Sequence, residues 1–244
     1  PGNFWERNLM RIGIGLACFV VLGALLSILR IPIDWRIFLA ISIILPLIML
    51  AKNRLKAFSE IDLKVTKTNL AIIALMLIFA VSFFVYASGA FKYPWLEDDD
   101  SWSHSIGAKY VAVEKTIYKP ANYSFQYLDP YPPGYDMLMG VLHQTNNSIS
   151  WTLKFFNALI ISLSLIFFFF FANLFMQSPS KALFSAFALA AMPAFFSHFI
   201  WATALSVTLF FVAFYTAQKS VSDRKWILPA TISVAAIMLS QPST

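Results

Sequence analysis

Four consecutive acidic residues interrupt a chain that is otherwise strongly apolar: Glu97, Asp98, Asp99 and Asp100. Adjacent like charges repel one another, so such a cluster needs cations or solvent to compensate it. Asp98 and Asp100 form an Asp-x-Asp pair, and carboxylates at this spacing can bind Mg²⁺ or Mn²⁺, which then bridge phosphate oxygens. Alternatively, one aspartate acts as a general base that takes a proton from an incoming hydroxyl group. The plainest interpretation is that the aspartates only cap and solvate the start of a helix.

His104 follows Asp100 by four residues, the spacing that places two side chains on one face of a helix. His104 could therefore join Asp98 and Asp100 as a nitrogen ligand of the metal or orient a carboxylate, and the alternative is that it is only a polar residue at the membrane interface. Large apolar residues recur at helical spacing through the same segment: Trp102, Ile106, Tyr110 and Val113. This pattern predicts an amphipathic helix that lies at a membrane surface. A second helix is expected to begin near Pro133, because proline suits the first helical turn.

The composition identifies the environment that these residues share. The chain is 59% hydrophobic and 12% charged, with a mean hydropathy of +0.70, whereas soluble proteins carry about 25% charged residues. This predicts an integral membrane protein. The net charge of +6 does not indicate nucleic-acid binding, because the basic residues lie mainly in short connections between apolar runs. The single cysteine, Cys18, excludes an internal disulfide and a cysteine-based zinc site.

Seven apolar runs are candidate spans, for which a helix needs about 20 residues. They cover residues 10–29, 37–51, 69–90, 153–176, 181–197, 199–217 and 226–241. The predicted fold is thus an all-α polytopic membrane protein with about seven transmembrane helices. The chain begins without methionine and ends directly after an apolar run, so we expect it to be the N-terminal part of a longer polypeptide.

Basic residues predict the orientation, because cytoplasmic loops are enriched in Lys and Arg. With a cytoplasmic N-terminus, the inner loops hold eleven of the 18 basic residues and only four of the 12 acidic residues. We therefore expect the large loop of residues 91–152 to lie outside the cytoplasm, on a plasma-membrane protein. Residues 1–68 would then form an N-terminal hairpin with a basic cytoplasmic loop, and residues 69–244 a transmembrane core.

The order of these features resembles the GT-C superfamily of membrane glycosyltransferases. An outward span leads within a few residues to the acidic cluster, an interfacial helix with a nearby histidine follows, and a Tyr-Pro-Pro-Gly-Tyr-Asp segment occupies residues 131–136. The resemblance covers residues 69–244. Within the superfamily, the sequence most resembles prokaryotic relatives of oligosaccharyltransferase catalytic subunits and protein O-mannosyltransferases. In many of these relatives the acidic loop follows the first span, whereas here two spans precede it.

The resemblance implies transfer of a sugar, with inversion, from a polyprenyl-phosphate-linked donor to a protein, lipid or glycan acceptor outside the cytoplasm. It implies that Asp98, Asp99 and Asp100 act as catalytic base or as ligands of a divalent metal. The departing phosphate needs a cation, which bound metal or a lysine would supply. The implied substrate-binding residues are Glu97, His104, Lys92, Lys109, Lys154, Tyr131, Tyr135 and His198. Gln241 is a further candidate on the same side of the membrane.

Two other functions fit the same sequence. A transporter or flippase of lipid-linked glycans would use the acidic cluster as a cation-attracting vestibule. The spans carry almost no ionisable residues at mid-bilayer, which argues against ion-coupled transport. In a non-catalytic assembly subunit the aspartates would be replaceable. Polar residues inside the later spans, such as Asn157 and Ser206, are expected mainly to form hydrogen bonds between helices.

Overall fold

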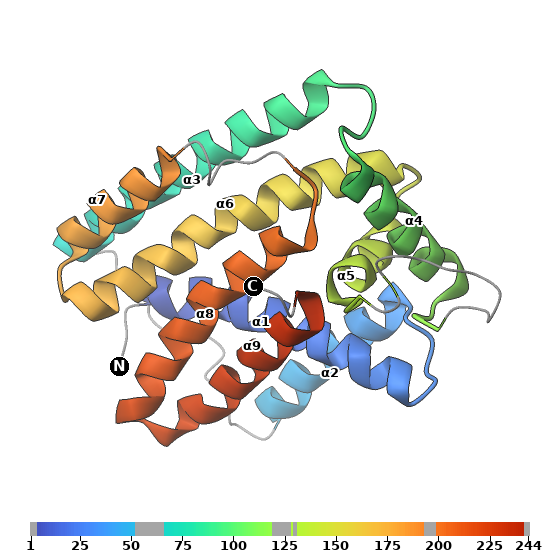
Figure 1. Ribbon diagram of the computed structural model, residues 1–244. Coiled ribbons are helices and arrows are strands. Elements are labelled where there is room, and N and C mark those ends of the chain that lie inside the picture. Colours follow the sequence, from blue (N-terminus) through green and yellow to red (C-terminus); the bar gives the residue numbers. More distant parts are fainter. Residues whose placement is uncertain (1–3, 52–65, 119–127, 129–130, 193–198, 242–244) are drawn as a thin grey trace.

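The computed structural model describes residues 4–51, 66–118, 128, 131–192 and 199–241. Within these ranges every regular element is a helix, and Figure 1 shows a bundle of helices with α4 and α5 at one end. The bundle consists of α1 (Phe4–Ile28), α2 (Trp35–Ala51), α3 (Lys67–Lys92), α6 (Ile149–Met176), α7 (Pro179–Ala190), α8 (Ala202–Ser222) and α9 (Ile227–Ser240). The helices at the end are α4 (Asp99–Glu114) and α5 (Gly134–His143), and a 3₁₀ turn, η1 (Arg224–Trp226), precedes α9.

Each of the seven predicted apolar runs overlaps a helix, although residues 193–197 of the fifth run lie outside the described residues, and the helices differ in length. Four of them, α1, α3, α6 and α8, are long and apolar enough to cross a membrane. Helices α2, α7 and α9 have 17, 12 and 14 residues, which correspond to about 18–26 Å and fall short of a hydrocarbon core of about 30 Å. The four long helices indicate a membrane protein, and the count of seven spans stays a prediction.

Helix α6 lies at the centre of the bundle, between α3 and α7 on one side and α8 on the other. Its phenylalanines fill this centre: Phe167, Phe169 and Phe170 are buried. Helix α1 packs closely against α8 because Gly13 has no side chain, and a Cβ at position 13 would lie 2.6 Å from the Val212 side chain. The segment predicted as a separate hairpin, residues 1–68, therefore contributes α1 to the same core as the later helices.

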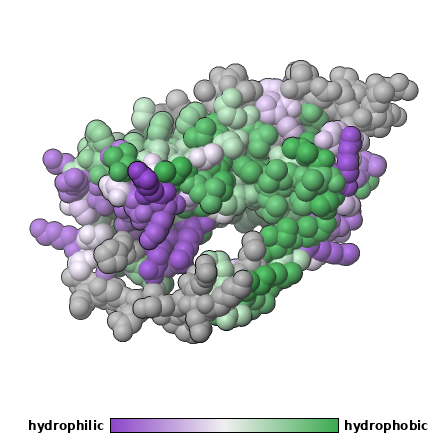
Figure 2. All heavy atoms as spheres, turned by 90° about the horizontal axis from the view of Figure 1, so that it is seen from below, coloured by the Kyte–Doolittle hydropathy of each residue, from purple (hydrophilic) through white to green (hydrophobic). Residues whose placement is uncertain are grey.

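Large apolar side chains cover the outside of the bundle. On α3, Leu70, Ile73 and Phe84 are all more than half exposed, and Phe84 is 70% exposed. Contiguous apolar surface of this kind is unstable in water but matches the hydrocarbon of a bilayer. Figure 2 shows the corresponding pattern, with hydrophilic residues gathered toward the ends and a broad hydrophobic region between them.

The two ends of the bundle differ in composition and connection. At one end, Glu6 of α1 accepts a hydrogen bond from Tyr215 of α8 and forms an ion pair with Lys219 of the same helix. At the other end α4 and α5 cover the ends of several long helices, and Gln144 donates to the Ile33 carbonyl and accepts from the Trp35 amide. The loops predicted to lie outside the cytoplasm thus meet at a single end.

The helix predicted from Trp102 to Val113 is present as α4, with its large apolar residues facing outward. Trp102, Ile106 and Val113 are exposed, whereas the buried face consists of small and polar residues: Ser101, His104, Ser105, Gly107, Ala108 and Val111. Small side chains allow α5 to approach so closely that a Cβ on Gly140 would lie 2.7 Å from the Ala108 carbonyl oxygen. The predicted second helix is also present as α5, and Pro133 is its N-cap.

Candidate functional site

The acidic cluster forms the N-terminus of α4, and its members are not equivalent. Asp98 is the N-cap, and its Oδ1 accepts a 2.7 Å hydrogen bond from the Ser101 amide. Asp98 therefore caps α4 as the plainest interpretation expects, and its second carboxylate oxygen takes no part in the cap. Asp99 and Asp100 occupy the first turn with exposed side chains. A helix N-terminus stabilises negative charge, so the turn can hold acidic groups in contact with solvent.

On one side of the cluster, Glu97 lies within electrostatic reach of Lys154 in the first turns of α6. Lys154 is only 4% exposed, and its Nζ donates a hydrogen bond to the Tyr93 carbonyl. The ammonium group also lies 5.8 Å from the centre of the Phe91 ring. A buried ammonium at the boundary between an apolar bundle and an acidic surface can provide a positive charge for an anion.

On the other side, Asp100 lies near Tyr131, which precedes α5. The Tyr131 hydroxyl donates a hydrogen bond to Oε1 of Gln241, the residue that caps the C-terminal end of α9. Burial raises the pKa of Tyr131, and the charges of Asp100 and Asp136 raise it further. Three segments far apart in the sequence therefore meet at Asp100, Tyr131 and Gln241.

Beneath the acidic turn, His104 and Asp136 form a buried pair. His104 Nδ1 lies 2.6 Å from Asp136 Oδ1, and the two side chains are 2% and 1% exposed. The Ala202 amide donates to His104 Nε2 at 3.3 Å, so a neutral His104 carries its proton on Nδ1 and donates it to Asp136. Burial raises the pKa of Asp136, and the contact with His104 opposes this rise. The pair joins α4, α5 and the first residue of α8.

A second set of hydrogen bonds holds the chain just before α8. Tyr135 donates to Asn157 Oδ1 at 3.0 Å, and Asn157 in turn donates to the Phe199 carbonyl at 3.0 Å. Ser101 donates a long hydrogen bond of 3.5 Å to the Ile200 carbonyl. Burial raises the pKa of Tyr135 well above its ordinary value, with a further contribution from Asp136. The entry to α8 is thus fixed by side chains of both α4 and α6.

The structure separates the predicted residues into four groups. Glu97, Asp100, Tyr131 and Lys154 lie around the acidic turn. His104 and Tyr135, which were predicted to bind substrate, are buried and contact Asp136 and Asn157 instead. Lys92 and Lys109 are exposed, and Lys109 follows Asp99 by ten residues, which is about 15 Å along α4. His198 lies outside the described residues.

The predicted metal ligands Asp98, Asp100 and His104 do not come together. In the described ranges, no group of three or more His, Cys, Asp or Glu side chains is placed to hold a metal ion. His104 points into the protein, where both ring nitrogens contact Asp136 and Ala202, and Oδ1 of Asp98 caps α4. These residues as arranged do not fit a metal site, and a requirement for Mg²⁺ or Mn²⁺ stays a prediction.

The sequence interpretation assigned no role to Asp136, which is the buried partner of His104. An acidic residue in a first helical turn is usually explained by the helix dipole. A signal was nevertheless present, because Asp136 is followed directly by Met137, Leu138 and Met139 in a helix that is buried along most of its length. A carboxyl group in such a helix needs a polar partner, and the sequence offered His104 as one candidate.

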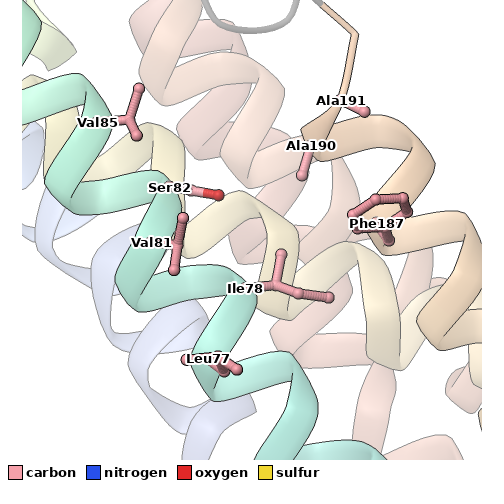
Figure 3. Close-up of a pocket in the computed structure, with 8 residues that line it drawn as sticks. All are labelled: Leu77, Ile78, Val81, Ser82, Val85, Phe187, Ala190 and Ala191. Carbon is pink, nitrogen blue, oxygen red and sulfur yellow. The ribbon is translucent and has the colours of Figure 1, made fainter.

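An apolar groove of about 540 Å³ lies between α3 and α7, with α6 behind it (Figure 3). Its lining residues are Leu77, Ile78, Val81, Ser82, Val85, Phe187, Ala190 and Ala191. The Ser82 hydroxyl points into the space between the two helices. Val85 precedes the end of α3 by seven residues, so the groove lies about 10 Å below the level of Lys92 and the acidic turn beyond it.

Comparison with known proteins finds no matching family model, no similar curated protein and no similar solved structure.

Proposed function

We propose that this chain is a membrane glycosyltransferase that uses a polyprenyl-phosphate-linked sugar as donor, in the manner implied by its resemblance to the GT-C superfamily. The observation that carries the proposal is the placement of exposed carboxylates on a rigidly supported helix turn at one end of an apolar bundle. Asp99 and Asp100 are solvent-accessible, Lys154 is buried beside the same turn, and a hydrogen-bond network lies beneath it.

In the proposed reaction, an acceptor nucleophile attacks the anomeric carbon from the face opposite the phosphate. The bond between that carbon and the phosphate oxygen breaks, and the polyprenyl phosphate leaves with the electron pair. Asp99 or Asp100 takes the proton of the acceptor. Lys154 stabilises the charge that develops on the departing phosphate, because a buried cation acts more strongly than one in water. Tyr131 and Gln241 form the side of the site that faces the sugar or the acceptor.

The groove between α3 and α7 supports a lipid-linked donor. It is lined almost entirely by apolar side chains and lies at the depth of the bilayer when the acidic turn is at its surface. A prenyl chain in this groove would bring its phosphate toward the end of α3 that leads to Glu97. The polar end of the donor and the acidic turn would then meet at the membrane boundary.

Conservative substitution of the acidic residues tests the proposal. Asp99→Asn and Asp100→Asn would be compared with Asp98→Asn in membranes supplied with a panel of radiolabelled polyprenyl-phosphate sugars, and the release of polyprenyl phosphate measured. We expect the loss of one catalytic carboxylate to reduce turnover on the order of 100-fold or more. Protein level and thermal unfolding serve as controls for folding. If all three variants turn the donor over at the wild-type rate, the proposed chemistry is wrong.

The groove is tested separately with Ser82→Phe, which would fill it, and with Ile73→Phe as a control on the exposed face of the same helix. We expect Ser82→Phe to raise the KM for a long-chain donor more than for a donor with a short prenyl chain. The control variant should leave both constants unchanged. An equal effect of Ser82→Phe on both donors would show that the lipid chain binds elsewhere.

A further inference from the structure

We propose that His104 and Asp136 are positioning residues that fasten the first turn of α8 to α4 and thereby hold the acidic turn of α4 in its working position. The inference rests on the function proposed above, because it assigns these residues a part in the same site. Neither side chain reaches the surface, so neither is proposed to contact substrate.

The first argument is the connection that the pair makes. The amide of Ala202, the first residue of α8, has no carbonyl partner within its own helix, as at every helix N-terminus. His104 Nε2 accepts its hydrogen bond at 3.3 Å, and the opposite ring nitrogen contacts Asp136 at 2.6 Å. The negative charge or dipole of Asp136 is thus linked through the imidazole ring to the positive end of α8. Two helices are joined by one side chain whose orientation Asp136 fixes.

The second argument is the path from this link to the acidic turn. His104 lies one helical turn beyond Asp100 and three residues beyond Ser101. Ser101 contacts the Ile200 carbonyl, and its own amide is capped by Asp98. A rotation or shift of α4 relative to α8 would therefore change both contacts, and it would move Asp99 and Asp100 relative to Lys154 and Tyr131. A displacement of about 1 Å is enough to reduce an enzyme's rate on the order of 100-fold.

The third argument is the energetic disadvantage of the pair. A buried carboxylate with a neutral partner is unfavourable compared with apolar side chains of the same size. Asp136 Oδ2, moreover, has no hydrogen-bond partner in the described part of the chain. Simple packing would be served better by leucine at either position. A polar pair at this position instead defines one orientation of the ring, and hence one register between α4 and α8.

Two variants of His104 separate the two halves of the link. Asn at position 104 reaches the place of Nδ1 and keeps a donor for Asp136, but it provides nothing at Nε2. Gln reaches the place of Nε2 and can accept from the Ala202 amide, but it provides no donor at Nδ1. The experiment measures hydrogen exchange at the Ala202 amide of the full chain in detergent, together with donor turnover and thermal unfolding.

We expect His104→Asn to make exchange at Ala202 several-fold faster and to lower kcat with little change in the KM for donor. His104→Gln should restore protection of the Ala202 amide and part of kcat. Asp136→Leu, which removes the acceptor that orients the ring, should also make exchange at Ala202 faster, and unchanged exchange in this variant would overturn the role assigned to Asp136. The proposal is overturned if His104→Asn leaves exchange at Ala202 unchanged, or if kcat falls equally in both His104 variants while the unfolding temperature falls with it. Should wild-type protein show no donor turnover at all, the function proposed above fails, whereas the exchange measurement still decides whether the link exists.

Discussion

Replacement of Gly107 by alanine is the most direct test of the buried pair. An ideal Cβ at position 107 would lie 2.1 Å from Oδ2 and 2.9 Å from Cγ of Asp136. Asp136 Oδ2 would have to retreat by about 1.3 Å or more to reach ordinary van der Waals contact. Because Oδ1 of the same group contacts His104 at 2.6 Å, this retreat disrupts the pair. Gly107 is therefore the residue that allows Asp136 to lie against α4.

The magnitude follows from a repacking cost and an opposing gain in helix propensity. A buried carboxylate that stayed charged after losing His104 would cost about 3–5 kcal/mol. Burial raises the pKa of Asp136, so the carboxyl can take up a proton, and the smaller overpacking range of about 1–3 kcal/mol applies. Alanine regains about 1 kcal/mol because it favours helix over glycine. We expect a net loss of up to about 2 kcal/mol, which for a chain of this length lowers the unfolding temperature by up to about 8 °C.

The assay is thermal unfolding of the purified full chain in one detergent, with Gly89→Ala and Gly15→Ala as matched controls. Neither control position has any atom within 4 Å of the added Cβ, so both variants should be as stable as the wild type or slightly more stable. Combining Gly107→Ala with Asp136→Ala should cost no more than Asp136→Ala alone, because the clashing carboxylate is gone. The reasoning is refuted if Gly107→Ala unfolds at the same temperature as Gly89→Ala, or if the double variant shows the full sum of the single effects.

Three further outcomes follow from the same geometry. Asp98→Ala should lose about 1 kcal/mol of stability with the N-cap of α4, and Asp98→Asn should retain it; thermal unfolding of both variants checks this. The Lys115 ammonium lies 2.6 Å from Asp34 and holds the pKa of that carboxyl below its ordinary value. The pair therefore stabilises the fold above about pH 4, and this stabilisation is lost as the pH falls through the lowered pKa. Lys115→Met should therefore cost about 0.2–1 kcal/mol at pH 7, less in high salt, and its difference from wild type should vanish in acid. Burial raises the pKa of Asp136 and favours its neutral form, so the stabilising effect of Asp136 is complete below about pH 4 and declines as the pH rises through the raised pKa. Between about pH 4 and pH 8 the unfolding temperature of the wild type should therefore fall relative to that of Asp136→Asn.

Several features of the fold could be predicted because they depend on neighbours in the sequence. An apolar run of sufficient length becomes a helix wherever backbone groups must be satisfied without water, which is why all seven predicted runs overlap helices in the described part of the chain. The spacing of Asp98 and Ser101 likewise suffices to define an N-cap. The length of α7 was less predictable, because the apolar run continues through Ala191 and Met192 beyond the residue at which this helix ends.

The face that α4 buries was harder to predict. Its large residues Trp102, Ile106 and Val113 form the obvious apolar stripe, and in a soluble protein that stripe would face the core. Close packing instead buries the opposite face, where Gly107 and Ala108 admit α5, and leaves the large residues exposed. His104 is buried as a consequence of this choice.

The sequence by itself determined the class of the molecule: an apolar, helical membrane protein with an acidic turn at the start of one short helix. Only the tertiary structure decided the partners of its polar groups, since His104 and Asp136 are 32 residues apart and His104 and Ala202 are 98 residues apart. Helix formation and capping depend on contacts within a few residues, which a sequence records directly. Pairing of buried polar groups depends on how α4, α5 and α8 pack together, and that arrangement is set by the shapes of side chains distributed over the whole chain.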